Sequence, residues 1–168
     1  MSSTNYFSYF PTLQYNNTIA VDILKRARLK DIDTLLKSAV FYQYTIADGE
    51  RPEDIAQRYY GNTKYYWLIL YANNIVNLYA QWPRSISVFE NFINSKYSGI
   101  EKATQTIHHY EDTNGNYIMK KDWNGSPVTE KSLYDYEWEL NEKKRFINII
   151  KKDYLNQIIK EMGKIFSK

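Results

Sequence analysis

The residues best suited to catalysis or metal binding are two adjacent histidines and two glutamates that stand two positions apart. His108 and His109 are the only histidines, and consecutive residues of a strand point to opposite faces, so they are not expected to form a two-histidine metal face. Glu137 and Glu139 would share one strand face and could mimic a glycosidase carboxylate pair, although charged solvent-facing residues are the commoner explanation. The sequence has no phosphate-binding glycine loop and no Gly-x-Ser-x-Gly motif. We therefore expect no enzymatic activity, no cofactor and no metal site.

The composition excludes several classes of protein and contains one unusual excess. The chain has 168 residues and no cysteine, which excludes a disulfide scaffold, a thiol nucleophile and a cysteine zinc site. The net charge is 22 − 19 = +3, too small by itself to indicate nucleic-acid binding. Tyrosine is frequent, with 17 residues beside 7 Phe and 4 Trp. Because tyrosine is enriched where proteins contact partners, this excess indicates an interaction protein, although low-GC coding bias could also inflate the number.

Residues 1–40 are predicted to form an extended N-terminal arm followed by short helices. The aromatic run Tyr6–Pro11 ends in a proline, which blocks a helix and favours an extended arm or an edge strand. Asn16 and Asn17 mark a turn, and the apolar residues after them suggest one or two helical pieces. An exposed aromatic arm is normally a docking element, and packing on its own domain is the alternative.

Residues 41–97 have the clearest pattern of strand and helix. Three apolar residues alternate with polar ones and predict a strand: Tyr42, Tyr44 and Ile46. Asp48-Gly49 then predicts a turn. A helix is expected from Pro52, a residue suited to the first helical position, as far as Gly61, which supplies a left-handed stop.

The second predicted helix is capped by Thr63 and is apolar on every side over Tyr65–Ala72. Such a helix must be covered on more than one face, so we expect either a partner chain or the C-terminal part of this chain to cover it. The apolar run is far shorter than the roughly 20 residues that cross a membrane. A third helix is predicted from Val88 to Tyr97.

Residues 98–168 are predicted to be a C-terminal extension of strands and a terminal helix. Asn114-Gly115 predicts a hairpin turn, and this hairpin either extends a neighbour's sheet by strand addition or belongs to an ordinary intrachain sheet. Aromatic residues alternate with acidic ones from Tyr134 to Leu140, which predicts a strand. A further strand over Phe146–Ile150 and a helix capped by Asp153 complete the extension.

Nine positions of the central region match the pattern of one known module. They give a strand, a glycine turn, a first helix and a second helix that ends in asparagine: Tyr44, Ile46, Gly49, Ile55, Ala56, Tyr59, Gly61, Leu70 and Asn73. The pattern resembles a LysM module. The resemblance implies an α+β protein with a small LysM-like βααβ body at residues 41–97, an arm at 1–40 and a hairpin and helix extension at 98–168.

A wider set of motifs resembles one family over most of the chain. The motifs are Tyr9-Phe10-Pro11 followed by Tyr15, then Asp48–Ala56, Tyr60-Gly61-Asn62, Trp67–Leu70, Asn73-Asn74-Ile75, Trp82-Pro83-Arg84-Ser85 and Leu140–Arg145. Together they resemble the LysM-containing baseplate wedge proteins of contractile-tailed (myovirus) bacteriophages. The resemblance implies a structural virion protein of the inner baseplate, which joins adjacent wedges around the hub during contractile tail assembly in the host cytoplasm.

The glycine turn departs from that of sugar-binding LysM modules. Their Gly-Asp-Thr turn is replaced by Gly49-Glu50-Arg51-Pro52, and no clear second strand follows Asn73-Asn74 at the usual distance. We therefore expect no glycan binding and a scaffold reused for protein contact. The alternative is a peptidoglycan- or chitin-binding LysM module of a cell-wall-associated protein.

The partners implied by the resemblance are other baseplate wedge and inner-baseplate proteins, in multiple copies around the hub, without nucleic acid or membrane. Residues 141–168 carry eight basic and three acidic residues, a weak signal for nucleic acid that fits the charged rim of a protein interface. The candidate contact aromatics lie on the arm, the second helix and the acidic strand: Tyr6, Phe7, Tyr9, Phe10, Tyr65, Tyr66, Trp67, Tyr134, Tyr136 and Trp138.

Overall fold

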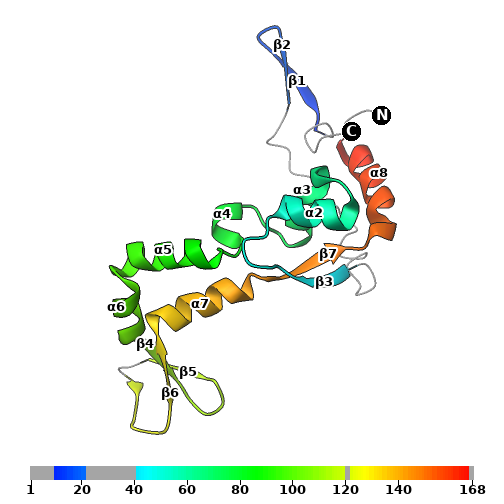
Figure 1. Ribbon diagram of the computed structural model, residues 1–168. Helices are drawn as coiled ribbons and strands as arrows, with labels where there is room; N and C mark the ends of the chain where they lie inside the picture. Colours follow the sequence, from blue (N-terminus) through cyan, green and yellow to red (C-terminus); the bar gives the residue numbers. More distant parts are fainter. Residues whose placement is uncertain (1–9, 22–40, 120–121, 167–168) are drawn as a thin grey trace. The chain divides into compact units, whose positions relative to one another are not determined.

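A computed structural model describes residues 10–21, 41–119 and 122–166, with side chains through Lys160 (Figure 1). The described chain mixes helices and strands, which confirms the α+β class. The predicted helical pieces after Val21 and the arm residues before Phe10 lie outside the described residues.

The chain divides into two compact units, each built from segments that are distant in sequence. Unit 1 comprises Met1–Tyr44, Arg51–Val76 and Asn148–Lys168, and unit 2 comprises Thr45–Glu50 and Asn77–Ile147. Unit 2 is therefore inserted into unit 1 at two places, and each unit is described by itself below.

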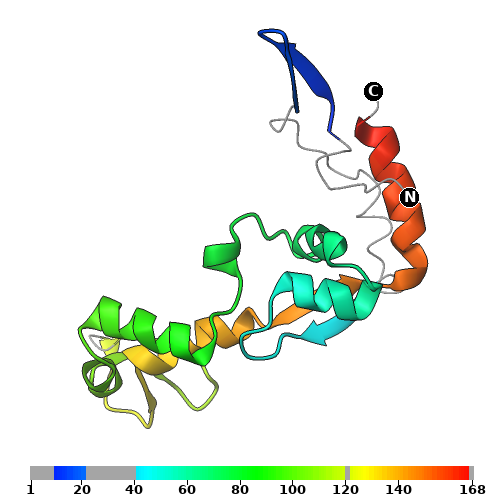
Figure 2. The same cartoon turned by 45° about the horizontal axis from the view of Figure 1, so that its top comes forward.

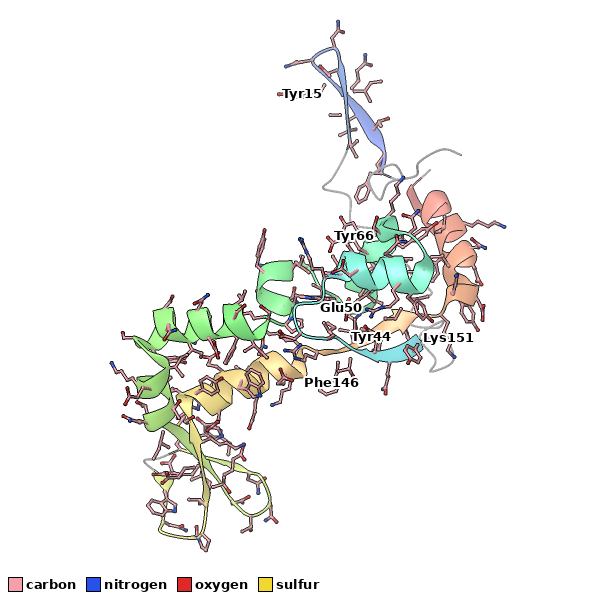
Figure 3. The ribbon with its side chains drawn as sticks, in the orientation of Figure 1. Tyr15, Tyr44, Glu50, Tyr66, Phe146 and Lys151 are labelled. Carbon is pink, nitrogen blue, oxygen red and sulfur yellow. The ribbon has the colours of Figure 1, made fainter. Side chains whose placement is uncertain are left out.

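Unit 1 begins with a two-stranded hairpin. Strand β1 (Thr12–Tyr15) pairs antiparallel with β2 (Thr18–Val21), and Tyr15 opposes Thr18. Asn16 and Asn17 have φ values of 44° and 62°, the left-handed geometry of a tight hairpin turn, so the predicted turn is confirmed. All eight strand residues are exposed, including Tyr15 at the end of β1 (Figure 3).

The body of unit 1 combines two strands and two principal helices. Strand β3 (Phe41–Thr45) pairs with β7 (Phe146–Ile150). Between them in sequence come α2 (Pro52–Tyr60), the short 3-10 helix η2 (Thr63–Tyr65) and α3 (Tyr66–Ala72). The 3-10 helix η4 (Lys152–Tyr154) and α8 (Leu155–Phe166) follow β7.

The ends of α2 follow from local chemistry, as predicted. Pro52 occupies the first turn, and the Asp54 carboxylate accepts a hydrogen bond from the Arg51 N–H at 3.2 Å. Gly61 ends the helix with φ 79°, a conformation that glycine adopts without strain.

Two of the predicted helix caps are wrong. The Asn62 side chain, one position before Thr63, caps η2 by accepting a hydrogen bond from the Lys64 N–H at 3.0 Å. The terminal helix is confirmed, but Asp153 lies inside η4 and α8 begins at Leu155. Asn and Thr both suit the position before a helix, and Asn62 takes it because its backbone is the extended residue just before the first turn.

The strand that pairs with β3 is delivered from far along the chain. No second strand was predicted soon after Asn73, and the strand predicted at Phe146–Ile150 pairs with β3 as β7. The Asn73 side chain also bonds to β7. Its amide donates to the Asn148 carbonyl at 2.8 Å, and its oxygen accepts from the Asn148 N–H at 2.8 Å. The same amide also donates to the Ile69 carbonyl.

Helix α3 is largely covered by the chain itself. Trp67, Leu68 and Ile69 are buried. These three residues are therefore covered by this chain and need no partner chain. Tyr65 and Tyr66 are half-buried. None of the helices in the described parts is both long and apolar enough to cross a bilayer.

Unit 2 combines helices with a small sheet (Figure 2). Its helices are α4 (Leu78–Gln81), α5 (Ile86–Tyr97), α6 (Ile100–Gln105) and α7 (Leu133–Lys143), and its strands are β4 (Ile107–Glu111), β5 (Tyr117–Ile118) and β6 (Thr129–Ser132). The helix predicted from Val88 to Tyr97 is confirmed as α5. The buried core comprises Phe89, Ile93 and Ala103, against which side chains of α7 pack.

The sheet of unit 2 has the antiparallel order β5-β4-β6. The predicted hairpin turn is confirmed, with Gly115 at φ 78° between β4 and β5. Strand β6 was not predicted, and its pairing with β4 makes the hairpin part of an intrachain sheet.

The predicted strand from Tyr134 to Leu140 is wrong, because these residues lie in helix α7. Ser132 and Asp135 form a reciprocal capping box, in which each side chain accepts a hydrogen bond from the other's N–H at 3.1 Å. Tyr134 and Trp138, four positions apart, both place their rings edge-on to Phe89. The spacing of these aromatic residues is compatible with one face of a helix as well as with a strand. The capping box and the packing on Phe89 favour the helix.

We predict that Tyr60→Phe lowers the free energy of unfolding by about 1–2 kcal/mol, because it leaves a buried carbonyl without its donor. The Tyr60 hydroxyl donates to the Ile150 carbonyl of β7 at 2.9 Å. Tyr59→Phe is the matched control, since the Tyr59 ring stacks on Tyr42 and its hydroxyl has no hydrogen bond among the described residues. Urea denaturation of both variants measures the effect, and equal losses would contradict the role of this bond.

Candidate functional site

Three motifs that are far apart in sequence meet in unit 2. We call this site the motif junction and define it as Asp48–Glu50, Trp82–Ile86 and four residues near the end of α7, namely Asn141, Glu142, Lys144 and Arg145. The first segment is the loop between β3 and α2, where Glu50 lies (Figure 3). The second leads into α5, and the third ends α7. All three segments contain residues of the family motifs given above, but the side-chain contacts that join them were not predicted.

Arg145 is the centre of the motif junction. Its side chain is only 10% exposed, and its guanidinium donates to Glu142 at 2.6 Å, to Asp48 at 3.1 Å and to the Ile46 carbonyl at 3.3 Å. The Arg145 carbonyl in turn accepts a hydrogen bond from the Ile46 N–H at 2.9 Å. Burial alone would lower the pKa of Arg145, but the hydrogen bonds to Glu142 and Asp48 outweigh it and raise the pKa. The guanidinium is therefore a permanent cation with partners on two segments.

The loop at Asp48–Glu50 is bonded to the segment before α5. The Asp48 carboxylate accepts a hydrogen bond from the N–H of Ile86, the first residue of α5, at 3.0 Å. The Glu50 carboxylate accepts from the Ala47 N–H at 3.0 Å, and the Glu50 carbonyl accepts from the Trp82 indole at 2.9 Å. Each acidic side chain of this loop thus accepts a backbone hydrogen bond that fixes the chain path.

Asn141 joins α7 to the segment before α5. Its oxygen accepts a hydrogen bond from the Arg84 N–H at 2.8 Å, and its amide donates to the Arg84 carbonyl at 3.0 Å. Asn141 is only 2% exposed, so this reciprocal pair replaces hydrogen bonds to water. Lys144, which follows α7, donates to the Ala80 carbonyl at 2.7 Å.

The two histidines meet, contrary to the prediction that they point to opposite faces. Their Nδ1 atoms lie 3.0 Å apart, at the place where the register of β4 against β6 shifts between Ile107 and His109. His108 stacks on Tyr136 and His109 on Tyr117. Burial, followed by the neighbouring His109, lowers the pKa of His108. Within the described residues, no group of three His, Asp or Glu side chains is arranged to hold a metal ion.

The two glutamates do not form a carboxylate pair. Because α7 is a helix, positions two apart point to different sides. Glu137 accepts hydrogen bonds from Lys96 at 2.6 Å and Tyr97 at 2.8 Å, whereas Glu139 is bonded to Lys131. The expectation of a shared strand face is therefore wrong, and each glutamate has a structural partner.

The predicted contact aromatics differ in exposure. Phe10 and Trp67 are 8% and 6% exposed, so their rings are already buried in this chain. Five others are half-buried: Tyr65, Tyr66, Tyr134, Tyr136 and Trp138. Tyr6, Phe7 and Tyr9 lie outside the described residues. Contact with partners stays a prediction for the residues that are not buried.

The nine LysM-type positions lie in or beside β3, α2 and α3. Ile55, Ala56 and Ile46 are buried, and Gly49 turns the chain at φ 71°. The Tyr44 hydroxyl accepts a hydrogen bond from Arg58 at 2.9 Å, and the Leu70 carbonyl accepts one from Ile75 at 2.8 Å. Tyr59, Gly61 and Asn73 have the contacts given above. These positions therefore serve packing, turns and hydrogen bonds within the two units.

Comparison with known proteins identifies the family. The family model described as base plate wedge protein 53 matches residues 5–128, well over half of the chain. The chain belongs to this family of base plate wedge proteins. A relative, the baseplate wedge protein gp53 of Enterobacteria phage T4, is 24% identical over 144 residues, which cover 74% of this chain and 73% of the relative. The matched range of the family includes the first two segments of the motif junction and ends before Asn141.

We predict that Arg145→Met lowers the free energy of unfolding by about 2–4 kcal/mol, because it removes a buried cation from two carboxylates and a carbonyl. Lys143→Met is the control: Lys143 is exposed and only two positions away, so its loss should stay within about 0.5 kcal/mol. Urea denaturation at neutral pH measures both. Equal stability of the two variants would show that the motif junction does not depend on Arg145.

The Glu137 carboxyl gives a second prediction, on pH. Burial raises its pKa, but the hydrogen bonds from Lys96 and Tyr97 outweigh burial and hold the pKa below its ordinary value. Its stabilisation is therefore complete above the ordinary pKa of about 4.3 and is lost as the pH falls through the lower folded value. The difference in unfolding free energy between wild type and Glu137→Gln should shrink below about pH 4.3. A difference that stays constant from pH 7 to pH 3 would contradict this.

Proposed function

We propose that this chain is a structural, non-enzymatic subunit of the inner baseplate of a contractile phage tail, where it joins adjacent wedges around the hub. The family match over residues 5–128 carries the proposal. The relative from phage T4 supports it, since its name is that of a baseplate wedge protein. Assembly then takes place in the host cytoplasm, in several copies around the hub, and the mature location is the virion tail baseplate.

The exposed apolar side chains support a mechanism of adhesion. Hairpin β1–β2 exposes Tyr15 and Ile19, which are 70% and 76% accessible. A two-stranded hairpin is at best marginally stable by itself in water. Phe146 of β7 and Tyr79 of α4 are also largely exposed. Surfaces of this kind are typical of subunits that are buried among others in an assembly.

The body of unit 1 fits a LysM-like scaffold used for protein contact. Its elements follow the order β3, α2, α3 and β7, a strand–helix–helix–strand arrangement. Sugar-binding modules bind glycans at this turn. Here both the carboxylate and the carbonyl of Glu50 in the turn accept hydrogen bonds from donors within the chain. This supports contact with proteins over contact with glycans.

Inactivation of the gene in its phage tests the proposal. We expect wedges that fail to close into baseplates and no contractile tails, with closure restored by the wild-type chain supplied from a plasmid. Electron microscopy of the particles and mass spectrometry of purified tails measure this. Tails that form without the chain would contradict the proposal. Retention of the purified chain on peptidoglycan, together with its absence from tails, would favour the cell-wall alternative.

A further inference from the structure

Unit 2 carries a group of basic side chains that its own carboxylates do not neutralise. We call Arg84, Lys96 and Lys144 the basic cluster. Glu137 is the acidic group that acts on all three, since it bonds Lys96 at 2.6 Å and interacts electrostatically with the other two. The three cations of the basic cluster and Glu137 together carry 3 − 1 = +2. In the described residues, no carboxylate forms an ion pair with Arg84 or Lys144.

Arg84 is held in place although, in the described part of the chain, no carboxylate forms an ion pair with its guanidinium. Both polar groups of its backbone are bonded to the side chain of Asn141. Its guanidinium carbon lies 4.2 Å from the centroid of the Phe92 ring, a stacking geometry that suits arginine. The planar donors around this carbon suit bidentate contact with a carboxylate. An arginine fixed in this way loses little conformational freedom when it binds.

Lys144 is the second cation of the cluster without a carboxylate. Its ammonium donates to the Ala80 carbonyl at 2.7 Å, which fixes its position. Burial and then the repulsion of Arg84 lower the pKa of Lys144. An added negative charge between the two cations would relieve this repulsion. Lys96 is already paired with Glu137 and lies over the Phe92 and Tyr97 rings, so the unbalanced charge resides on Arg84 and Lys144.

We propose that the basic cluster binds a segment of a neighbouring baseplate protein that presents at least two carboxylates to Arg84 and Lys144. The proposal rests on the proposed function and adds the chemistry of one contact. A charge of +2 beside an aromatic ring matches a short acidic protein segment. Duplex-binding proteins commonly neutralise about 6–10 phosphates, more than this cluster provides. Arginines and aromatic rings are also the residues on which protein interfaces most often depend.

Binding of a labelled hexaglutamate peptide to the full-length chain tests the cluster directly. Fluorescence anisotropy at low ionic strength should show tighter binding of hexaglutamate than of hexaglutamine, with affinity that falls as salt is added. Arg84→Glu and Lys144→Glu should each weaken binding at least tenfold. Lys143→Glu, the same charge change at an exposed position next to Lys144, should stay within about twofold. Equal binding of the two peptides, or equal losses in all three variants, would overturn the proposal.

Two further measurements keep the result interpretable. Circular dichroism melting establishes that the variants are folded, and Arg84→Gln, which removes the charge without reversing it, should also lose binding if the guanidinium is the contact. A 12-base-pair DNA duplex serves as the competing probe. Tighter binding of the duplex than of hexaglutamate, with loss on Arg84→Glu, would overturn the protein-segment proposal in favour of nucleic acid.

Complementation in the phage separates this proposal from the proposed function. Arg84→Glu combined with Lys144→Glu should reduce tail formation at least tenfold, while Lys143→Glu should complement like wild type. Normal tails with the double variant would overturn the role of the basic cluster and leave the proposed function intact. Normal tails without any copy of the chain would overturn the proposed function itself.

Discussion

The guanidinium of Arg145 is the interaction on which the arrangement of unit 2 depends. A buried cation is stable only if carboxylates and carbonyls replace its hydration shell, and its partners Asp48 and Ile46 stand almost a hundred positions earlier in the chain. Asp48 also binds the first N–H of α5, while Arg145 follows the end of α7. One ionic contact therefore fixes the start of one helix, the end of another and the pairing of Ile46 with Arg145.

This pairing also explains how unit 1 obtains its second strand. The insertion of unit 2 leaves α3 far in sequence from β7, and the cost in loop entropy of closing such an insertion grows only slowly with its length. The chain that leaves Arg145 enters β7 directly, beside the strand that precedes Ile46. Asn73 then satisfies the N–H and the carbonyl of Asn148. A side chain at the end of α3 thus supplies hydrogen bonds that a neighbouring strand would otherwise provide.

Local signals predicted local structure, and contacts between distant residues decided the rest. Pro52 and Gly61 set the ends of α2 because each acts on its own backbone, and Asn114-Gly115 did the same for the hairpin. The spacing of the aromatic residues after Tyr134 fits both a strand and a helix. The capping box at Ser132 and the contacts with the Phe89 ring favour the helix. His108 and His109 meet where the register of β4 against β6 shifts, and the two residue types alone do not predict such a shift. The roles of Arg84, Asn141 and Arg145 depend on partners about 60 to 100 positions away.

The hydrogen bonds that close unit 2 also orient its unbalanced charges. Asn141 fixes the backbone of Arg84 from within α7, and Lys144 follows the same helix and is bonded to the segment that precedes Arg84. A shift of α7 against that segment would break these hydrogen bonds and change the separation of Arg84 and Lys144. A ligand that binds both Arg84 and Lys144 would therefore stabilise this arrangement of unit 2 by its binding free energy. The two hydrogen bonds between the Asn141 side chain and the Arg84 backbone therefore couple the folding of unit 2 to recognition by the basic cluster.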